Sequence, residues 1–378
     1  MSHIVLIQLK LKIDMKRFCV AIAVAMSVFV VSCAETGSRV SLAVEEHQNW
    51  DGAKLYGNVA HIASTQYELA GSYGRFVKTE LMSQKSVEFN ERGDVTLEAE
   101  YDIDSMLIER RAYQYDEKGY LVDYVYEDEG SRSENRYLRD VYGCVVERNL
   151  LKADGSLDTR YTTKYNANGD VVEEARYSSD NAMERKVVTE YDAKHNPQKV
   201  FNYSGDGTML RREVYAYDES GRLVELSEYD TYDNVESRKV VTYGENGKDE
   251  DVVVYDCNGA CDSHYANRYD ESGRLVEHTT YDAKGAIIER KASVYDANNN
   301  VVEQVVTTAN DVVLKVVTNK YDDKGLLVQA IEDDRLHGKY DMMLYAYDSQ
   351  NNLIRETNYY GKRLEPQFVI EYAITYRE

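Results

Sequence analysis

From about residue 89 onward, short apolar segments alternate with polar turns at a fixed spacing. The clearest markers are eight tyrosines at a constant interval, namely Tyr165, Tyr191, Tyr217, Tyr243, Tyr269, Tyr295, Tyr321 and Tyr347. A second tyrosine series lies between them, at Tyr177, Tyr203, Tyr229, Tyr255, Tyr281 and Tyr359. Such self-similarity indicates an array of equivalent structural units. Each unit therefore has two parts, a shorter one such as Tyr165 to Tyr177 and a longer one such as Tyr177 to Tyr191.

Each part of the unit predicts one β-strand followed by one tight turn. Asp follows the first-series Tyr in most units, and Asp side chains bond their own backbone at turns. Four residues after that Tyr, a residue suited to positive φ recurs: Gly169, Gly221, Gly247, Gly273 and Gly325, or in their place His195, Asn299 and Asn351. Apolar pairs such as Leu223-Val224 then start the next strand. Because the two parts differ in length, we expect different turns at the two edges.

Short turns join antiparallel neighbours, so one unit is a β-hairpin with its link to the next hairpin. We expect about 22 strands of about 8 residues, and open sheets of that width curl. The predicted fold class is all-β, a long antiparallel β-hairpin repeat array coiled into a spiral or shell-like sheet. Residues 89–378 form this array, and residues 50–88 are expected to be N-terminal capping β-hairpins.

The N-terminus has the layout of a secretory signal. Lys16-Arg17 precedes an apolar run of about a dozen residues, too short for a comfortable membrane span. We expect a signal peptide over residues 1–32, with Met15 as the true start. The run ends in Val30-Val31-Ser32-Cys33, which resembles the lipobox of bacterial lipoproteins. The alternative is an ordinary signal peptide that ends near a Cys.

The lipobox resemblance implies that Cys33 is acylated and becomes the mature N-terminus, so that the membrane is a partner through this lipid anchor. Residues 33–49 then form the lipidated Cys and a tether. Ala34 differs from the Asp that retains such proteins at the inner membrane, so we expect an outer membrane lipoprotein. The choice between the periplasmic face and the cell surface stays open.

The formal net charge of −22 argues against nucleic acid as a partner, because so acidic a chain repels the phosphate backbone. No nucleic-acid partner is expected. Cys257 and Cys261 span one turn and could pair or remain free thiols.

The segments Tyr217–Val224 and Tyr269–Val276 both read Tyr-Asp-Glu-Ser-Gly-Arg-Leu-Val. They resemble the core motif of the YD-repeat, or RHS-repeat, family, and the resemblance extends from about residue 87 to residue 360. It implies an all-β fold. Large members of that family wind their repeats into a shell around a toxin or plug, or act as adhesion stalks. The combination with a lipobox is similar to stand-alone lipoproteins with degenerate YD repeats.

No nucleotide-binding, metalloprotease or nucleophile-elbow motif stands in a suitable context, so we expect no enzyme, no catalytic residues and no cofactor. Residues 166–170 and 296–300 faintly resemble calcium loops but lack the acid at position 12, so no metal is expected. The eight first-series tyrosines are either packing residues of the turns or a ladder that binds a ligand. We therefore expect a cell-envelope-anchored scaffold that binds a glycan or protein. The alternative is a structural spacer or a shell fragment that shields a partner protein.

Overall fold

A computed structural model describes residues 55–245, 247–248 and 250–378, which form an all-β structure of 24 antiparallel strands. The signal peptide, Cys33 and the tether lie outside the described residues. The described residues contain no helix long and apolar enough to cross a membrane. The strands are β1 (Val59–Ser72), β2 (Arg75–Phe89), β3 (Val95–Tyr101), β4 (Leu107–Tyr115), β5 (Leu121–Asp128), β6 (Arg132–Arg139), β7 (Val145–Leu151), β8 (Leu157–Tyr165), β9 (Val171–Tyr177), β10 (Met183–Tyr191), β11 (Pro197–Ser204), β12 (Met209–Tyr217), β13 (Leu223–Tyr229), β14 (Val235–Tyr243), β15 (Glu250–Asp256), β16 (Cys261–Tyr269), β17 (Leu275–Tyr281), β18 (Ile287–Tyr295), β19 (Val301–Thr308), β20 (Val313–Tyr321), β21 (Leu327–Asp334), β22 (Lys339–Tyr347), β23 (Leu353–Tyr360) and β24 (Glu365–Tyr376).

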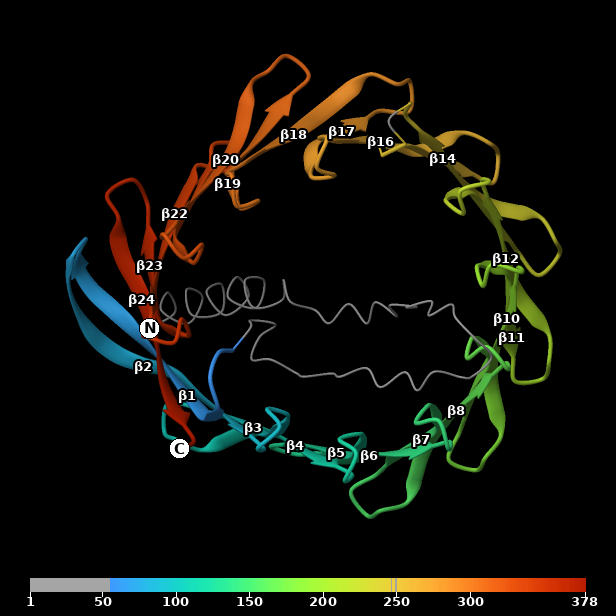
Figure 1. The fold of residues 1–378 in the computed structure, drawn as a ribbon, viewed down its shortest axis with the longest axis horizontal. Helices are drawn as coiled ribbons and strands as arrows, with labels where there is room; N and C mark the ends of the chain where they lie inside the picture. The colour runs from blue at the N-terminus through green and yellow to red at the C-terminus, as the bar shows by residue number, and fades with distance from the viewer. Residues whose placement is uncertain (1–54, 246, 249) are drawn as a thin grey trace, which may run out of the picture.

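The sheet closes on itself into a ring-shaped barrel (Figure 1). Each strand pairs with its neighbours in sequence, and β1 also pairs antiparallel with β24. The all-β hairpin array is thus confirmed, but the expected spiral is wrong because the first and last strands satisfy each other's backbone groups. An unpaired edge would leave a row of free donors and acceptors, and closure removes it.

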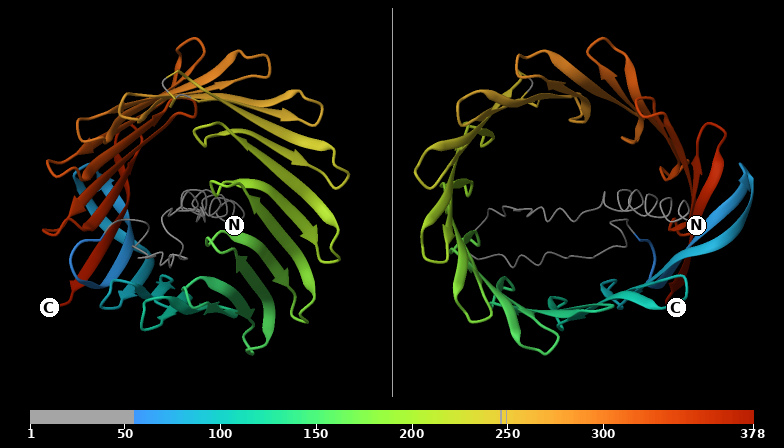
Figure 2. Two further views of the ribbon diagram at one scale, coloured as in Figure 1. Left: turned by 45° about the vertical axis from the view of Figure 1, so that its right-hand side comes forward. Right: turned by 180° about the vertical axis from the view of Figure 1, so that it is seen from behind.

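The turns lie on two rims of this ring. We call the rim at which each even-numbered strand passes into the next odd-numbered strand the main rim, and the other the opposite rim. The β1–β2 hairpin belongs to the opposite rim and flares outward in Figures 1 and 2. Both ends of the described chain lie at the main rim, where the Arg377 backbone N–H donates to the carbonyl of Asn58.

Most repeats carry the same type of turn on both rims, which corrects the expectation drawn from the unequal parts of the unit. The Asp218 backbone N–H donates to the Arg222 carbonyl at 2.9 Å on the main rim, and Asp230 donates to Asn234 at 2.9 Å on the opposite rim. The difference lies in the strands instead, because β12 has 9 residues and β13 has 7.

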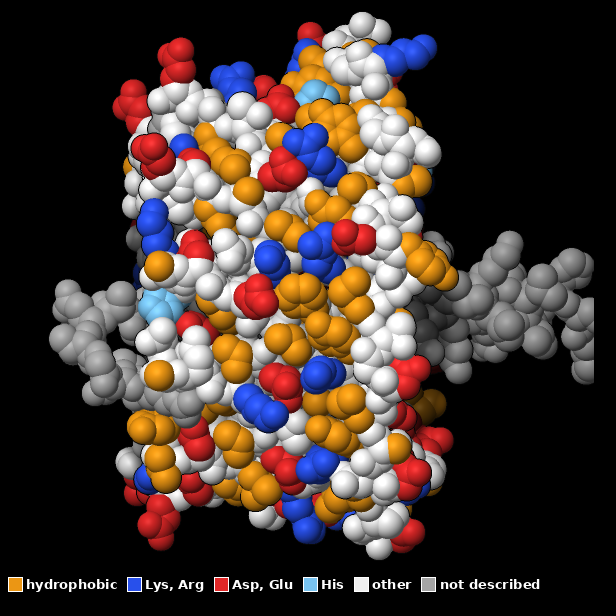
Figure 3. Space-filling view, turned by 90° about the vertical axis from the view of Figure 1, so that its right-hand side faces the viewer, with side chains coloured by type: hydrophobic (Ala, Val, Ile, Leu, Met, Phe, Trp, Pro, Cys, Tyr) orange, Lys and Arg blue, Asp and Glu red, His pale blue; other side chains and the backbone are white. Residues whose placement is uncertain are grey.

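The main hydrophobic cluster lies where β1 meets its neighbours. Val59, Ile62, Val87, Phe89 and Val95 are buried there, and side chains from β24 pack against them. Elsewhere most strand residues of the repeats are half-buried, as expected of a wall that is one sheet thick. Over the part of the wall that holds β10 to β12, hydrophobic, basic and acidic side chains interleave (Figure 3).

Candidate functional site

The repeated turn is built around the carboxylate of its first Asp. Asp270 Oδ1 accepts from the backbone N–H of Ser272 at 2.9 Å and of Arg274 at 3.0 Å. Gly273 N–H donates to the Asp270 carbonyl at 2.9 Å, which closes the turn. These are the local bonds for which Asp is favoured at turns. They explain why Asp follows Tyr in the sequence.

The fourth turn residue adopts positive φ in every repeat that the motif predicted. Gly221 and Gly273 both have φ near +81°, and the substitutes keep the conformation, with φ of 66° at His195 and 74° at Asn351. Asn tolerates this region better than most residues with a Cβ. His195 also places its Nδ1 2.9 Å from a carboxylate oxygen of Asp170 in the preceding turn.

The first-series tyrosines bridge neighbouring hairpins at the main rim. Between β11 and β12 the backbone pairing ends at Lys199–Val214, three residues before Tyr217. The Tyr217 hydroxyl then donates to the Pro197 carbonyl at 2.8 Å. The same bond to the carbonyl 20 residues earlier, at 2.8–3.1 Å, is made by Tyr165, Tyr191, Tyr243, Tyr295, Tyr321 and Tyr347. Tyr269 ends β16 at the corresponding position. Burial is the largest cause that raises the pKa of Tyr165 to about 12.

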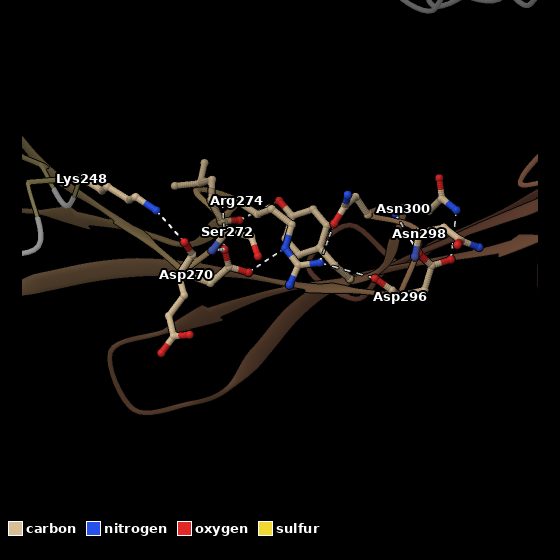
Figure 4. A network of polar contacts seen from close by, with 11 residues as sticks. Lys248, Asp270, Ser272, Arg274, Asp296, Asn298 and Asn300 are labelled. Carbon is tan, nitrogen blue, oxygen red and sulfur yellow. Dashed lines mark hydrogen bonds and ion pairs between the residues drawn. The ribbon is translucent and has the colours of Figure 1, made fainter.

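The arginine of the two complete motifs links three features at once (Figure 4). Arg274 Nε donates to Asp270 Oδ2 of its own turn at 2.6 Å. Its guanidinium also lies 4.9 Å from the centre of the Tyr295 ring and donates to Asn299 Oδ1 of the next turn at 3.0 Å. Arg222 repeats this pattern with its own Asp, the next Tyr and the next turn. The motif arginine therefore joins consecutive turns around the rim.

Other main-rim turns use different side chains for the same purpose. Lys194 Nζ donates to the Glu219 carbonyl at 2.9 Å, and Lys248 Nζ to the Glu271 carbonyl at 2.7 Å. At the end of the array, Asn352 is 1% exposed, donates to the Tyr56 carbonyl and accepts from its N–H. The last turn is thus bonded to the start of the described chain, which extends the turn-to-turn contacts across the point of ring closure.

The second tyrosine series lies toward the opposite rim, where several rings face a basic residue of the neighbouring strand. Arg160 lies 4.2 Å from the centre of the Tyr177 ring, and Arg212 lies 4.3 Å from that of Tyr229. In the repeat with His264, the imidazole stacks on Tyr281 at 4.3 Å. Cation–π contacts such as those of Arg160 and Arg212 stabilise exposed surfaces by roughly 0.5–1 kcal/mol each.

The other candidates from the sequence occupy separate places. Cys257 is exposed, Cys261 is half-buried, and both are free thiols. Asn166 Oδ1 accepts from the N–H groups of Asn168 and Asp170 inside its own turn. In the described part of the chain, no group of three or more His, Cys, Asp or Glu residues is arranged to hold a metal.

Removing one tyrosine hydroxyl tests the bridge between hairpins. Tyr217→Phe is expected to lower the free energy of unfolding by about 0.5–1.5 kcal/mol, because the Pro197 carbonyl loses its donor. Urea denaturation followed by circular dichroism measures this change. Tyr232→Phe is the matched control, since Tyr232 is 82% exposed. Equal effects of the two substitutions would contradict a bridging role.

The turn carboxylates also predict acid sensitivity. Hydrogen bonds, of which the one from the Ser204 hydroxyl is the largest cause, lower the pKa of Asp206 to about 2, and backbone donors lower the pKa of Asp218 and Asp270. A lowered folded-state pKa stabilises the protein above the unfolded-state pKa, and this contribution is lost as the pH falls through the folded-state value. The melting temperature should therefore fall between about pH 4 and pH 2.

Asp206→Ala provides the control for this acid effect. The variant should melt below the wild type at neutral pH, and the gap should narrow as the pH approaches 2, because the pKa of Asp206 lies at about that value. Asp262→Asn, at an exposed residue of β16, should leave the acid slope unchanged. A gap that stays constant with pH would rule out the charged form of Asp206 as the stabilising species.

Comparison with known proteins finds no matching family model and no matching curated protein. Among solved structures, the TcdB2-TccC3-TEV chain is 12% identical over 80% of this chain and 22% of its own length, with a TM-score of 0.31. A second TcdB2-TccC3 structure is 12% identical over 76% of this chain and 19% of its own, with a TM-score of 0.33. A porin-like protein from Bacteroides uniformis is 8% identical over 85% of this chain and 98% of its own, with a TM-score of 0.26. The chain spans about a fifth of the length of the TcdB2-TccC3 chains that it matches.

Proposed function

We propose that the protein is a non-catalytic binding scaffold of the cell envelope, which presents its ring to a glycan or a protein. The observation that carries the proposal is the closure of 24 strands through the β1–β24 pairing. Barrels of about eight strands fill their interior with side chains, whereas those of about 16–18 strands leave a channel. A ring of 24 strands therefore offers an interior wider than its own side chains fill.

The contacts of the tyrosines narrow down where a ligand would bind. First-series hydroxyls donate to backbone carbonyls, and rings such as Tyr243 and Tyr229 already face an arginine. A ligand that stacked on these rows would have to displace contacts within the protein. We infer that ligand contacts come from the ring interior and the rims rather than from continuous tyrosine rows.

We further propose that the protein is an outer membrane lipoprotein related to the YD-repeat proteins, held in the membrane by lipid on Cys33. The basic residues, the apolar run and the Cys support the anchor. Radioactive palmitate fed to the producing cells should label the wild type and leave Cys33→Ala unlabelled. A labelled Cys33→Ala protein would contradict the assignment of the anchor.

Binding is tested with the full chain purified in mild detergent. We expect saturable binding to a defined set of ligands on a glycan array or in a pairwise protein screen. Heat-unfolded protein is the control, because a scaffold whose surface depends on the ring must lose these ligands on unfolding. Binding that is unchanged after unfolding, or no signal above background, would contradict the binding function.

A shell that shields a partner is the second candidate, and the same closure of the ring favours it. Purification from the native cells should then yield a partner in fixed stoichiometry. Electron microscopy of that complex should show density inside the ring that the chain itself does not account for. An unoccupied ring without a partner would contradict this candidate and leave the binding scaffold intact.

A further inference from the structure

The last two turns of the opposite rim depart from the repeat. The strand pairs that flank them end at Asp334–Lys339 and Tyr360–Glu365, so each connection has four residues, 335–338 and 361–364, where most other repeats have five. The sequence departs as well, because Asp333 stands where most repeats have a second-series tyrosine. A carboxylate is smaller than a phenol ring, so Asp333 occupies less space than the tyrosine of the other repeats.

A cavity of about 330 Å³ lies between the two turns, and we call it the terminal-turn cavity. Its walls include Asp333, Arg335, Lys339, Tyr340, Tyr360 and Lys362. Tyr360 is 43% exposed, so part of its ring is available to a ligand. A volume of this size is at the low end of small-molecule sites, which start at roughly 300 Å³. It suits a mono- or disaccharide.

The charges around the terminal-turn cavity are only partly matched. Arg335 pairs with Asp333 at 3.0 Å, and Asp334 lies 2.8 Å from His337. Lys339 and Lys362 form no ion pair within 4.0 Å among the described residues. Burial raises the pKa of Asp341, and the positive charge of Lys339 opposes that rise. Two lysines are therefore free to meet an anion on a protein whose net charge is −22.

We propose that the terminal-turn cavity binds a sugar that carries an anionic group. Lys339 and Lys362 hold the carboxylate or phosphate, because an ammonium group provides three donors and a positive charge. The exposed part of the Tyr360 ring packs against the flat apolar face of the sugar, as amphipathic aromatic side chains do at binding surfaces. This assignment rests on the proposed binding function and names its ligand class.

The test titrates the full chain with glucuronic acid, glucose 6-phosphate and glucose, and records saturation-transfer NMR signals of each sugar. We expect saturable binding of at least one anionic sugar at millimolar concentrations and weaker binding of glucose. The double variant Lys339→Ala/Lys362→Ala should lower the affinity for the anionic sugar at least tenfold. The matched control Lys118→Ala/Lys284→Ala removes two lysines from other exposed turns and should bind as the wild type does.

The two anionic sugars distinguish a carboxylate from a phosphate ligand, and binding of either supports the proposal. Equal binding of glucose, no saturable binding of either anionic sugar, or equal loss in both double variants would overturn it. Circular dichroism spectra and melting curves show whether each variant is folded. If Lys339→Ala/Lys362→Ala keeps the ligands found on the glycan array, the scaffold function stands and only the cavity assignment fails.

Discussion

Replacing Ile62 by Ala is expected to lower the free energy of unfolding by about 2–5 kcal/mol. Ile62 is 2% exposed and lies on β1, opposite Ile374 of β24 and Val87 of β2. It belongs to the hydrophobic cluster that holds the ring closed. Truncation removes buried methyl and methylene groups and leaves a cavity that a closed sheet cannot easily collapse. The loss should therefore appear as a lower urea midpoint.

Ile288→Ala is the matched control, because Ile288 on β18 is 53% exposed and its truncation should cost less than about 0.5 kcal/mol. Urea denaturation of both variants by circular dichroism gives the comparison. Small-angle scattering of the Ile62 variant should show an opened, larger particle before full unfolding. Equal losses at Ile62 and Ile288 would mean that the closure adds no special stability.

The sequence predicted the hairpins well because their determinants are local. The Tyr-Asp pair and the positive-φ residue fix each turn, and the pairing of Tyr217 with Leu223 follows directly from the length of that turn. Between about residues 125 and 150 the repeat in the sequence shifts its phase by roughly two residues, and the structure gives the reason. There the turn is shorter, and the Asp128 backbone N–H donates to the Ser131 carbonyl.

Ring closure could not be predicted because it depends on strands that lack the repeat. β1 and β24 lie at the two ends of the described chain, and neither carries the Tyr-Asp motif. Their pairing extends from Val59–Tyr376 to Glu68–Phe368. It requires that the tilt and number of all 24 strands bring the two ends together. The sequence of a single repeat does not specify the total number of strands or their combined tilt.

At the candidate sites, too, contacts within one turn could be predicted from the sequence, whereas contacts between different turns could not. The role of Asp270 in its turn was readable from the motif, whereas the reach of Arg274 to Asn299 depends on how consecutive hairpins stack. The only available signal was the recurrence of Gly-Arg-Leu in two repeats. Asp333 was visible as a break in the tyrosine series, but the cavity beside it arises from two turns that are distant in sequence.

Gly221→Ala is expected to lower the free energy of unfolding by about 1–2 kcal/mol. Gly221 has φ of +81°, a region in which a Cβ approaches the following carbonyl oxygen. Apart from the two adjacent residues, no residue has an atom within 4 Å of the position that its Cβ would take, so the cost comes from the local backbone conformation. Urea denaturation measures it, and Gly221→Asn should cost less, because Asn299 and Asn351 adopt φ of 68° and 74° at the same turn position.

Gly130→Ala is the control that isolates this conformational requirement. Gly130 is also a turn glycine with open space around its Cβ position, but it does not have positive φ. Its replacement should be neutral or slightly stabilising, because Ala restricts the unfolded chain. If Ala had the same effect at both positions, positive φ would not be what selects Gly221. The repeat would then owe its glycine to chain flexibility, and the order Gly, Asn, Ala expected for stability at residue 221 would disappear.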